Sequence, residues 1–226
     1  RGYNQTFSER LLVLVNGKQM YLEFFGLEAW DLLPVELSEI RQIEVVRGPN
    51  TALFGFNAVS GVVNIVTYNP LHETRHAVDV GGGSQNTLFA SAATSMKLTD
   101  RVGLRLSAGG FDADEFDTDR PIPIDPDPVL AEPRRRSVAG ELVAQVTDHT
   151  QVSLDGSYSE LDRNDMNPAA RIDGSSQLEF WSVRGKILSD TPLGTVTVNG
   201  YHNQVRNRAE IFRPNRQLGG LTPVNG

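Results

Sequence analysis

The sequence predicts a mainly β protein, in which a small α+β portion precedes part of an antiparallel, up-and-down transmembrane β-barrel. Up to about residue 70, short apolar runs are separated by turn residues, whereas the later runs are long and alternate apolar with polar side chains. Several later runs reach ten residues or more, while strands of soluble proteins usually have about five or six. Their connections alternate between short and long. We therefore expect two parts, residues 1–70 and residues 71–226.

Composition excludes several classes of protein. The 226 residues include 21 basic and 28 acidic side chains, a net charge of −7 that argues against a general nucleic-acid binder. The chain has no cysteine, so it has neither a disulfide framework nor a thiol nucleophile. The longest apolar stretch without a charge, residues 57–68, is shorter than the roughly 20 residues of a membrane-spanning helix. Spanning by a helix is therefore excluded.

The first predicted element is a hairpin. Residues 11–15 are a continuous apolar run, typical of a buried strand. The pair Asn16 and Gly17 follows, and both residues tolerate the positive φ angles that a tight hairpin turn requires. Residues 18–23 then lead away from the turn.

Short helical turns and two strands complete this part. Residues 27–33 predict one or two helical turns ended by Pro34, and residues 34–40 suit a short helix with proline at its first position. A strand is expected over residues 42–46, stopped by a Gly-Pro pair, and a last buried strand over residues 61–67. Between them, a helical turn at residues 52–54 has Asn50 or Thr51 as its N-cap.

Seven long strands are predicted after residue 70, over residues 75–83, 87–98, 101–111, 136–147, 150–161, 177–188 and 194–206. In residues 101–111, for example, Arg105 and Ser107 lie opposite a face of valine, leucine and alanine. Such alternation places one face of the sheet in an apolar medium and the other in a polar one.

Strand length and connection length favour a membrane barrel. About ten residues, tilted by about 40°, cross the apolar band of an outer-membrane barrel, about 25 Å tall. The connections at residues 99–100, 148–149 and 189–193 are short, and those at 112–135 and 162–176 are long. Such barrels have short turns on one rim and long loops on the other. The short link at 84–86 departs from this rhythm, and the many glycines and alanines leave a two-sheet sandwich open.

Several motifs of the first part resemble, in order and spacing, the plug of a TonB-dependent outer-membrane receptor. These motifs are Arg1-Gly2, LVLVNG at 12–17, IRQIEVVRGP at 40–49, ALFG at 52–55, Asn57-Ala58 and GVVNIVT at 61–67. The resemblance implies a plug inside a barrel of about 22 strands. Residues 1–70 would then be the C-terminal part of the plug, and residues 71–226 about seven of the barrel strands. The start at Arg1 and the end at Gly226 suggest a piece of a longer protein, the alternative being a complete mature domain with a frayed tail.

The resemblance also implies a function. The complete protein would reside in the bacterial outer membrane, among its lipids and lipopolysaccharide, and import a ferric siderophore, a similar metal chelate or cobalamin. Its energy would come through TonB, contacted by a segment missing from this chain. No enzyme signature is present, because the glycines at 81–83 lack a strand-to-helix setting and the four histidines lack metal-ligand spacing. The alternative is a soluble all-β module that binds a ligand or a carbohydrate.

Arg47 is the residue for which the resemblance implies a role in plug–barrel ion pairing. In the family this arginine pairs with glutamates of the barrel wall and locks the plug. A buried guanidinium needs such partners, because uncompensated burial of charge is costly. Glu44, Glu141 and solvent are the alternative partners.

Four residues after the hairpin are the candidates for substrate binding: Phe24, Phe25, Trp30 and Asp31. In related receptors the equivalent loop rises towards the outside and touches the ligand. Aromatic rings on such a loop suit stacking on a ring-bearing chelate or a macrocycle. The alternative is that these rings anchor the plug to the barrel wall.

The loop 112–127 holds the candidate metal ligands, Asp112, Asp114, Asp117 and Asp119. Clustered carboxylate oxygens suit a structural Ca²⁺ ion. The alternative is a solvated surface loop. No other cofactor is expected.

Overall fold

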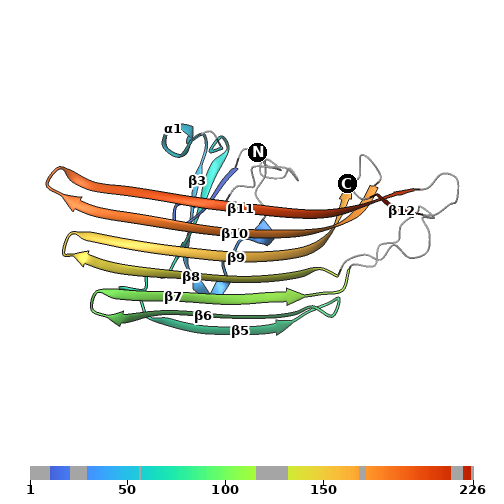
Figure 1. The fold of residues 1–226 in the computed structure, drawn as a ribbon, viewed down its shortest axis with the longest axis horizontal. Coiled ribbons are helices and arrows are strands. Elements are labelled where there is room, and N and C mark those ends of the chain that lie inside the picture. The colour runs from blue at the N-terminus through green and yellow to red at the C-terminus, as the bar shows by residue number, and fades with distance from the viewer. Residues whose placement is uncertain are drawn as a thin grey trace.

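A computed structural model describes residues 11–20, 30–55, 57–115, 132–167, 172–214 and 221–224. The chain forms two β-sheets (Figure 1). The small sheet consists of β1 (Leu11–Val15), β2 (Lys18–Gln19), β3 (Ile40–Arg47) and β4 (Gly61–Thr67). Its strand order is β2-β1-β4-β3, with β1 parallel to β4 and the other pairs antiparallel.

The predicted hairpin of the small sheet is present. Asn16 and Gly17 have φ angles of 50° and 75°, so both adopt the left-handed conformation that the turn requires. The turn sets the register in which Val15 pairs with Lys18. The second strand of the hairpin, β2, comprises Lys18 and Gln19, and residues 21–23 of the expected segment lie outside the described residues.

The expected helices of this part are single turns. They are η1 (Trp30–Leu32), η2 (Leu37–Glu39) and α1 (Thr51–Phe54), of which the first two are 3-10 helices. Asn50 is the N-cap of α1, but its side chain donates to the carbonyl of Gly48 at 2.9 Å and caps nothing. Within the described ranges, no helix combines the length and apolar character needed to span a membrane.

The large sheet contains the long strands. They are β5 (Arg75–Gly82), β6 (Leu88–Thr99), β7 (Val102–Asp112), β8 (Arg134–Thr147), β9 (Thr150–Asn167), β10 (Ile172–Thr191), β11 (Gly194–Pro214) and the short β12 (Leu221–Val224). They lie side by side in chain order, and every neighbouring pair is antiparallel. The sheet is open, with β5 and β12 at its edges. The predicted fold class, mainly β with part of an up-and-down barrel, is confirmed.

The predicted ends of the last three long strands are wrong. The strands β9, β10 and β11 extend past residues 161, 188 and 206, and β10 also begins before residue 177. The expected long loop at 162–176 is therefore mostly strand, with only residues 168–171 between β9 and β10. Pairing continues there because each strand satisfies the backbone of its neighbour, even where the apolar alternation stops.

The two faces of the large sheet differ in exposure as expected of a barrel wall. Its polar face, which includes Arg105, Ser107 and Asp155, is buried. Its apolar face, which includes Leu142 and Leu154, is exposed. A two-sheet sandwich would bury the apolar face, so that alternative is wrong.

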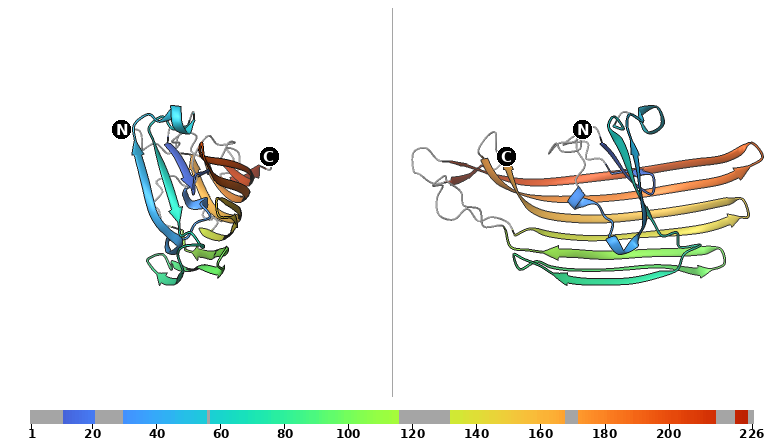
Figure 2. Two further views of the ribbon diagram at one scale, coloured as in Figure 1. Left: turned by 90° about the vertical axis from the view of Figure 1, so that its left-hand side faces the viewer. Right: turned by 180° about the vertical axis from the view of Figure 1, so that it is seen from behind.

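The small sheet stands on the polar face of the large sheet, within its curve (Figure 2). One apolar cluster joins them: Leu11, Val13 and Val15 of β1 pack with Leu161, Leu178 and Phe180 of the large sheet. The opposite face of β1 packs in a second cluster within the small sheet. By contrast, β3 is exposed over almost its whole length.

Candidate functional site

A row of four charged side chains crosses the polar face of the large sheet. Arg105 on β7 lies directly opposite Glu141 on β8, which lies opposite Asp155 on β9, which lies opposite Arg184 on β10. The order of charges is positive, negative, negative, positive. We call these four residues the charged row. Directly opposite like charges repel, so Glu141 and Asp155 need additional positive charge nearby.

The N-terminal part supplies one charge to each half of the charged row. Arg105 is bonded to Glu39 and also to Glu141, the latter at 3.0 Å. Lys18 lies 2.8 Å from Asp155, whose other oxygen accepts from Arg184 at 2.5 Å. Lys18 and Glu39 are only 4% and 2% exposed. The six charges balance, which is what their burial requires.

Burial changes the protonation equilibrium of Lys18. Removal from water lowers the pKa of its ammonium below the ordinary value of 10.5, although the neighbouring Asp155 carboxylate acts in the opposite direction. The charged form of Lys18 is therefore held in place by Asp155 at an energetic cost.

The 3-10 helix η2 and its N-cap residue supply two of the carboxylates that reach the large sheet. Glu36 and Glu39 form a capping box, in which the Glu36 backbone N–H donates to Glu39 Oε1 at 2.9 Å. Arg135 on β8 donates to Glu36 Oε1 at 3.0 Å and to the carbonyl of Leu33 at 2.7 Å. Hydroxyls of the large sheet also donate, Ser107 to Glu39 and Ser137 to Glu36. The local cap therefore fixes the positions of both carboxylates.

The tip of the first hairpin is held by backbone contacts as well. Arg184 donates to the carbonyl of Asn16 at 2.7 Å, and Asn203 on β11 donates to the carbonyl of Gln19 at 3.3 Å. The hairpin is thus bound to β9, β10 and β11, whereas η2 is bound to β7 and β8.

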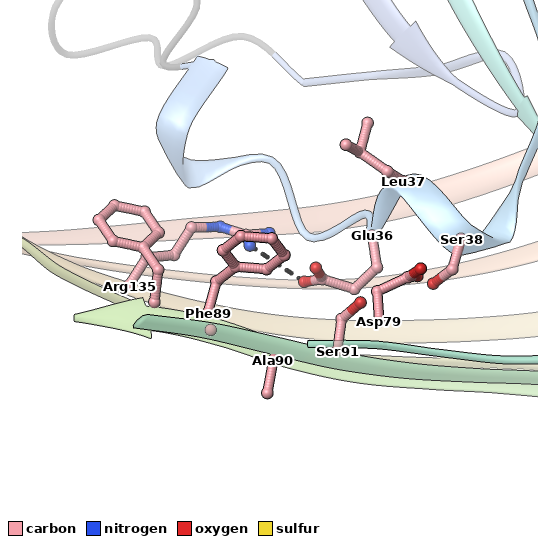
Figure 3. Close-up of a pocket in the computed structure, with 10 residues that line it drawn as sticks. Glu36, Leu37, Ser38, Asp79, Phe89, Ala90, Ser91 and Arg135 are labelled. Atoms are coloured by element: carbon pink, nitrogen blue, oxygen red, sulfur yellow. Dashed lines mark hydrogen bonds and ion pairs between the residues drawn. The ribbon is translucent and has the colours of Figure 1, made fainter. Parts of the chain in front are cut away.

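A cavity of about 360 Å³ lies beside η2, at the end of the large sheet that carries the connection 113–133. Figure 3 shows Glu36 and Arg135 joined across it, with Phe89 and Asp79 rising from the neighbouring strands. The lining combines aromatic rings, a guanidinium and carboxylates. Such a mixture suits contact with a polar ligand that also has ring surface.

The predicted substrate-binding residues are only partly described. Trp30 and Asp31 lie exposed in η1, directly before the buried Leu32. Phe24 and Phe25 lie outside the described residues. The role of all four in ligand contact stays a prediction.

The structure does not bring the predicted ion-pairing residues Arg47 and Glu44 together. Glu44 accepts hydrogen bonds from Gln42 at 2.6 Å and from Asn64 at 2.9 Å. Arg47 is exposed at the end of β3, with no ion pair to any described residue. Pairing of Arg47 with a later strand of the wall stays a prediction.

The predicted calcium ligands also stay a prediction. Asp112 is bonded to Arg134, and Asp114 accepts from Asn86. Asp117 and Asp119 lie outside the described residues. Over the part of the chain that is described, no group of three or more His, Cys, Asp or Glu side chains is placed to hold a metal ion.

The sequence pattern placed Arg105 on the polar face but did not predict which residues of the N-terminal part contact that face. The sequence alone does not reveal the partners of Lys18, Glu36 and Glu39, because these residues lie in short segments of mixed composition. One usable signal was present: charged residues on the inner face of a barrel wall are expensive to bury and need partners from whatever fills the barrel.

Comparison with known proteins agrees with this geometry. The sequence profile of the TonB-dependent Receptor Plug Domain matches residues 1–62. The chain is 30% identical to the vitamin B12 transporter BtuB of Photobacterium profundum, over 91% of this chain and 34% of the relative. It is 29% identical to the ferric enterobactin receptor PirA of Pseudomonas aeruginosa, over 67% of this chain and 23% of the relative. The chain thus spans at most about a third of the length of these curated relatives.

Two solved receptor structures have a similar fold. The siderophore receptor PirA of Pseudomonas aeruginosa superposes with a TM-score of 0.69 at 23% identity, covering 93% of this chain and 38% of that one. The alcaligin receptor FauA of Bordetella pertussis superposes with a TM-score of 0.67 at 17% identity, covering 89% and 32%. At such identities these similarities concern the fold alone.

Proposed function

From the membership of this chain in the TonB-dependent receptors of the outer membrane, we propose that the complete protein actively imports a metal chelate. The proposed ligand is a ferric siderophore or a similar chelate, cobalamin included. Relatives whose names specify vitamin B12 or ferric enterobactin support this ligand class. Import of this kind needs binding and release but no covalent step, so we propose no enzymatic activity.

One observation supports the proposal most directly. The small sheet, which we now call the plug, fills the polar side of the wall and is bound there through a balanced set of buried ion pairs. A charged group of an ion pair can exchange its partner for water, whereas a charged group left unpaired in a dry interior is costly. A plug bound in this way can be displaced once water enters the contact, as transport through the barrel requires.

The mechanism we propose has three steps. The ligand first binds on the side of the connection 113–133, over the cavity between Phe89 and Arg135. Binding then makes a plug segment that lies outside this chain available to TonB. Force from TonB finally separates Lys18 and Glu39 from the charged row and opens a path along the wall. The plug would thus be the less stable element inside a stable wall.

Uptake by the complete receptor tests the proposal. A strain that lacks the receptor gene would carry the full-length gene on a plasmid and be offered radiolabelled cobalamin and a panel of iron-59-labelled siderophores. We expect accumulation of at least one of these compounds, abolished in a matched strain without TonB. The proposal would be contradicted if none of these compounds accumulated, or if accumulation were unchanged in the strain without TonB.

The alternative, a soluble ligand- or carbohydrate-binding module, is tested by fractionation of the same cells. An outer-membrane receptor is recovered with detergent and changes its gel mobility on heating, because its barrel resists unfolding. Recovery of the complete protein as a monomer without detergent would favour the soluble module.

A further inference from the structure

A second, polar cavity lies on the other side of the charged row. Its volume is about 430 Å³, larger than the cavity beside η2. The plug contributes Asn16, the end of β4 and the connection at residues 68–70, and the wall contributes β8, β9 and β10. The charged row marks the boundary, because Glu141 and Arg184 line this cavity. We call it the lower cavity.

The lower cavity belongs to the periplasmic side of the wall. Its lining includes Gln151 and Leu188, which lie within a few residues of the short turns that follow β8 and β10. In outer-membrane barrels the short turns face the periplasm and the long loops face outwards. Between the two large cavities, at Lys18, Arg105 and Asp155, only a space of about 20 Å³ remains. Such a space holds about one water molecule.

Lys186 gives the lower cavity a positive charge that no acidic side chain in the described part of the chain balances. It lies on the inner face of β10, directly opposite Ser153. Arg184 is paired with Asp155, Arg41 with Glu73, and Glu141 with Arg105. Among the described residues, Lys186 alone of the charged groups that line the cavity has no partner of opposite charge.

Such a group attracts a mobile anion. Lys186 is half-buried between the plug and the wall, so water screens its charge less than on an open surface. Carboxylates and phosphates form the strongest hydrogen bonds with ammonium and guanidinium groups. Gln151 and Ser153 flank Lys186 and offer further hydrogen-bonding groups.

We propose that the lower cavity is an anion-binding site, in which Lys186 binds a carboxylate or phosphate group on the periplasmic side of the charged row. Its use in transport, which rests on the proposed function above, is to receive an anionic group of the imported ligand once the charged row has opened. The site itself does not depend on that use, because a free anion of the periplasm would be bound by the same side chains.

The test of the site uses inorganic phosphate and the complete receptor in phosphate-free detergent buffer. Binding is measured by isothermal titration calorimetry on wild type, Lys186→Gln and Lys186→Arg. We expect saturable binding that Lys186→Gln weakens at least tenfold and Lys186→Arg retains. The matched control is Lys97→Gln, because Lys97 is paired with Asp100 beside a short turn and does not line the cavity. Absence of saturable binding in wild type, or equal binding in Lys186→Gln, would overturn the proposal.

A second arm distinguishes the two sources of the anion. If the site receives the imported ligand, Lys186→Gln slows uptake severalfold while ligand affinity at the cell surface stays unchanged. If phosphate binding depends on Lys186 but uptake is unaffected, the site serves free anions and its use in transport is rejected. If wild type imports none of the tested ligands, the proposed function fails, whereas the phosphate measurement still decides the site.

Discussion

Glu39 has two tasks that depend on each other. Its carboxylate accepts from the backbone N–H of Glu36 and thereby closes the cap of η2. The same carboxylate binds Arg105 and Ser107 of the wall. Local helix capping therefore positions the group that the wall recognises, and the side chain is almost completely buried as a result. A change at Arg105 should thus alter the stability of the plug as well as that of the wall.

Replacement of Arg105 by methionine should weaken the attachment of the plug strongly. The change leaves Glu39 and Glu141 buried without their shared cation, and loss of one partner of a buried pair costs about 3–5 kcal/mol. The measurement is the free energy of plug unfolding in urea, followed by a fluorescent probe on the small sheet of the complete receptor. Arg101→Met is the control, since Arg101 pairs with Asp148 on the surface, where a pair contributes at most about 1 kcal/mol. Equal effects of the two variants would contradict this reading of the charged row.

Lys18 should make plug stability depend on pH in the alkaline range. Its folded-state pKa lies below 10.5, so between that lowered pKa and 10.5 the unfolded chain binds more protons than the folded one. The stability of wild type relative to Lys18→Met should therefore rise with pH up to 10.5 and fall as pH drops through the lowered pKa. Urea unfolding of both proteins across this range is the measurement. A flat or falling difference would show that burial does not dominate at Lys18.

At the scale of elements, the plug and the wall meet so closely that a glycine is required. Gly103 lies on the inner face of β7, where the connection from β4 passes over it. A Cβ atom at this position would lie 2.5 Å from the carbonyl carbon of Pro70 and 2.7 Å from the nitrogen of Leu71. Both are backbone atoms, so they cannot move aside as a flexible side chain would.

Gly103→Ala should therefore displace the connection and loosen the plug. We expect the plug of this variant to be cleaved faster by protease than that of wild type, because the connection must shift by several tenths of an ångström or more. The matched control is Gly185→Ala on β10, where an added Cβ meets nothing within 4 Å. Cleavage at the wild-type rate in Gly103→Ala would mean that the connection is free to move.

For the whole molecule, the outward apolar face of the wall determines where the protein can reside. Val138, Leu142, Leu154, Val183 and Ile187 are all at least 40% exposed, which a protein surrounded by water rarely tolerates over so large an area. Tyr158 and Trp181 lie directly opposite each other on the same face, as in the aromatic girdles of outer-membrane barrels. The face is therefore built for contact with lipid.

An arginine on this face should be costly in proportion to its depth. Leu142→Arg lies in the middle of the apolar run of β8 and should destabilise the complete receptor by about 2–4 kcal/mol. Val146→Arg lies next to the short turn, near the membrane surface, and should cost at most about 1 kcal/mol. The measurement is urea-dependent folding into lipid vesicles. Equal costs at the two depths would contradict the lipid-facing assignment.

Much of the fold could be predicted from local pattern. The alternation that assigns Arg105 to one face and Leu106 to the other is a property of neighbouring residues, and it survives in the structure because strand geometry has a period of two. The hairpin turn at Asn16 and Gly17 is likewise a local preference for positive φ. Resemblance to the plug motifs identified the family for the same reason, because those motifs are continuous in sequence.

Tertiary structure alone decided which charges meet. The pair of Lys18 with Asp155 joins residues 137 positions apart, and the pair of Arg105 with Glu39 joins residues 66 apart. Such pairs depend on the register of four wall strands and on how the plug sits against them, and no short stretch of sequence encodes either. The sequence pattern also did not predict the full length of β9, β10 and β11, because backbone pairing with a neighbour extends a strand after its apolar pattern has ended.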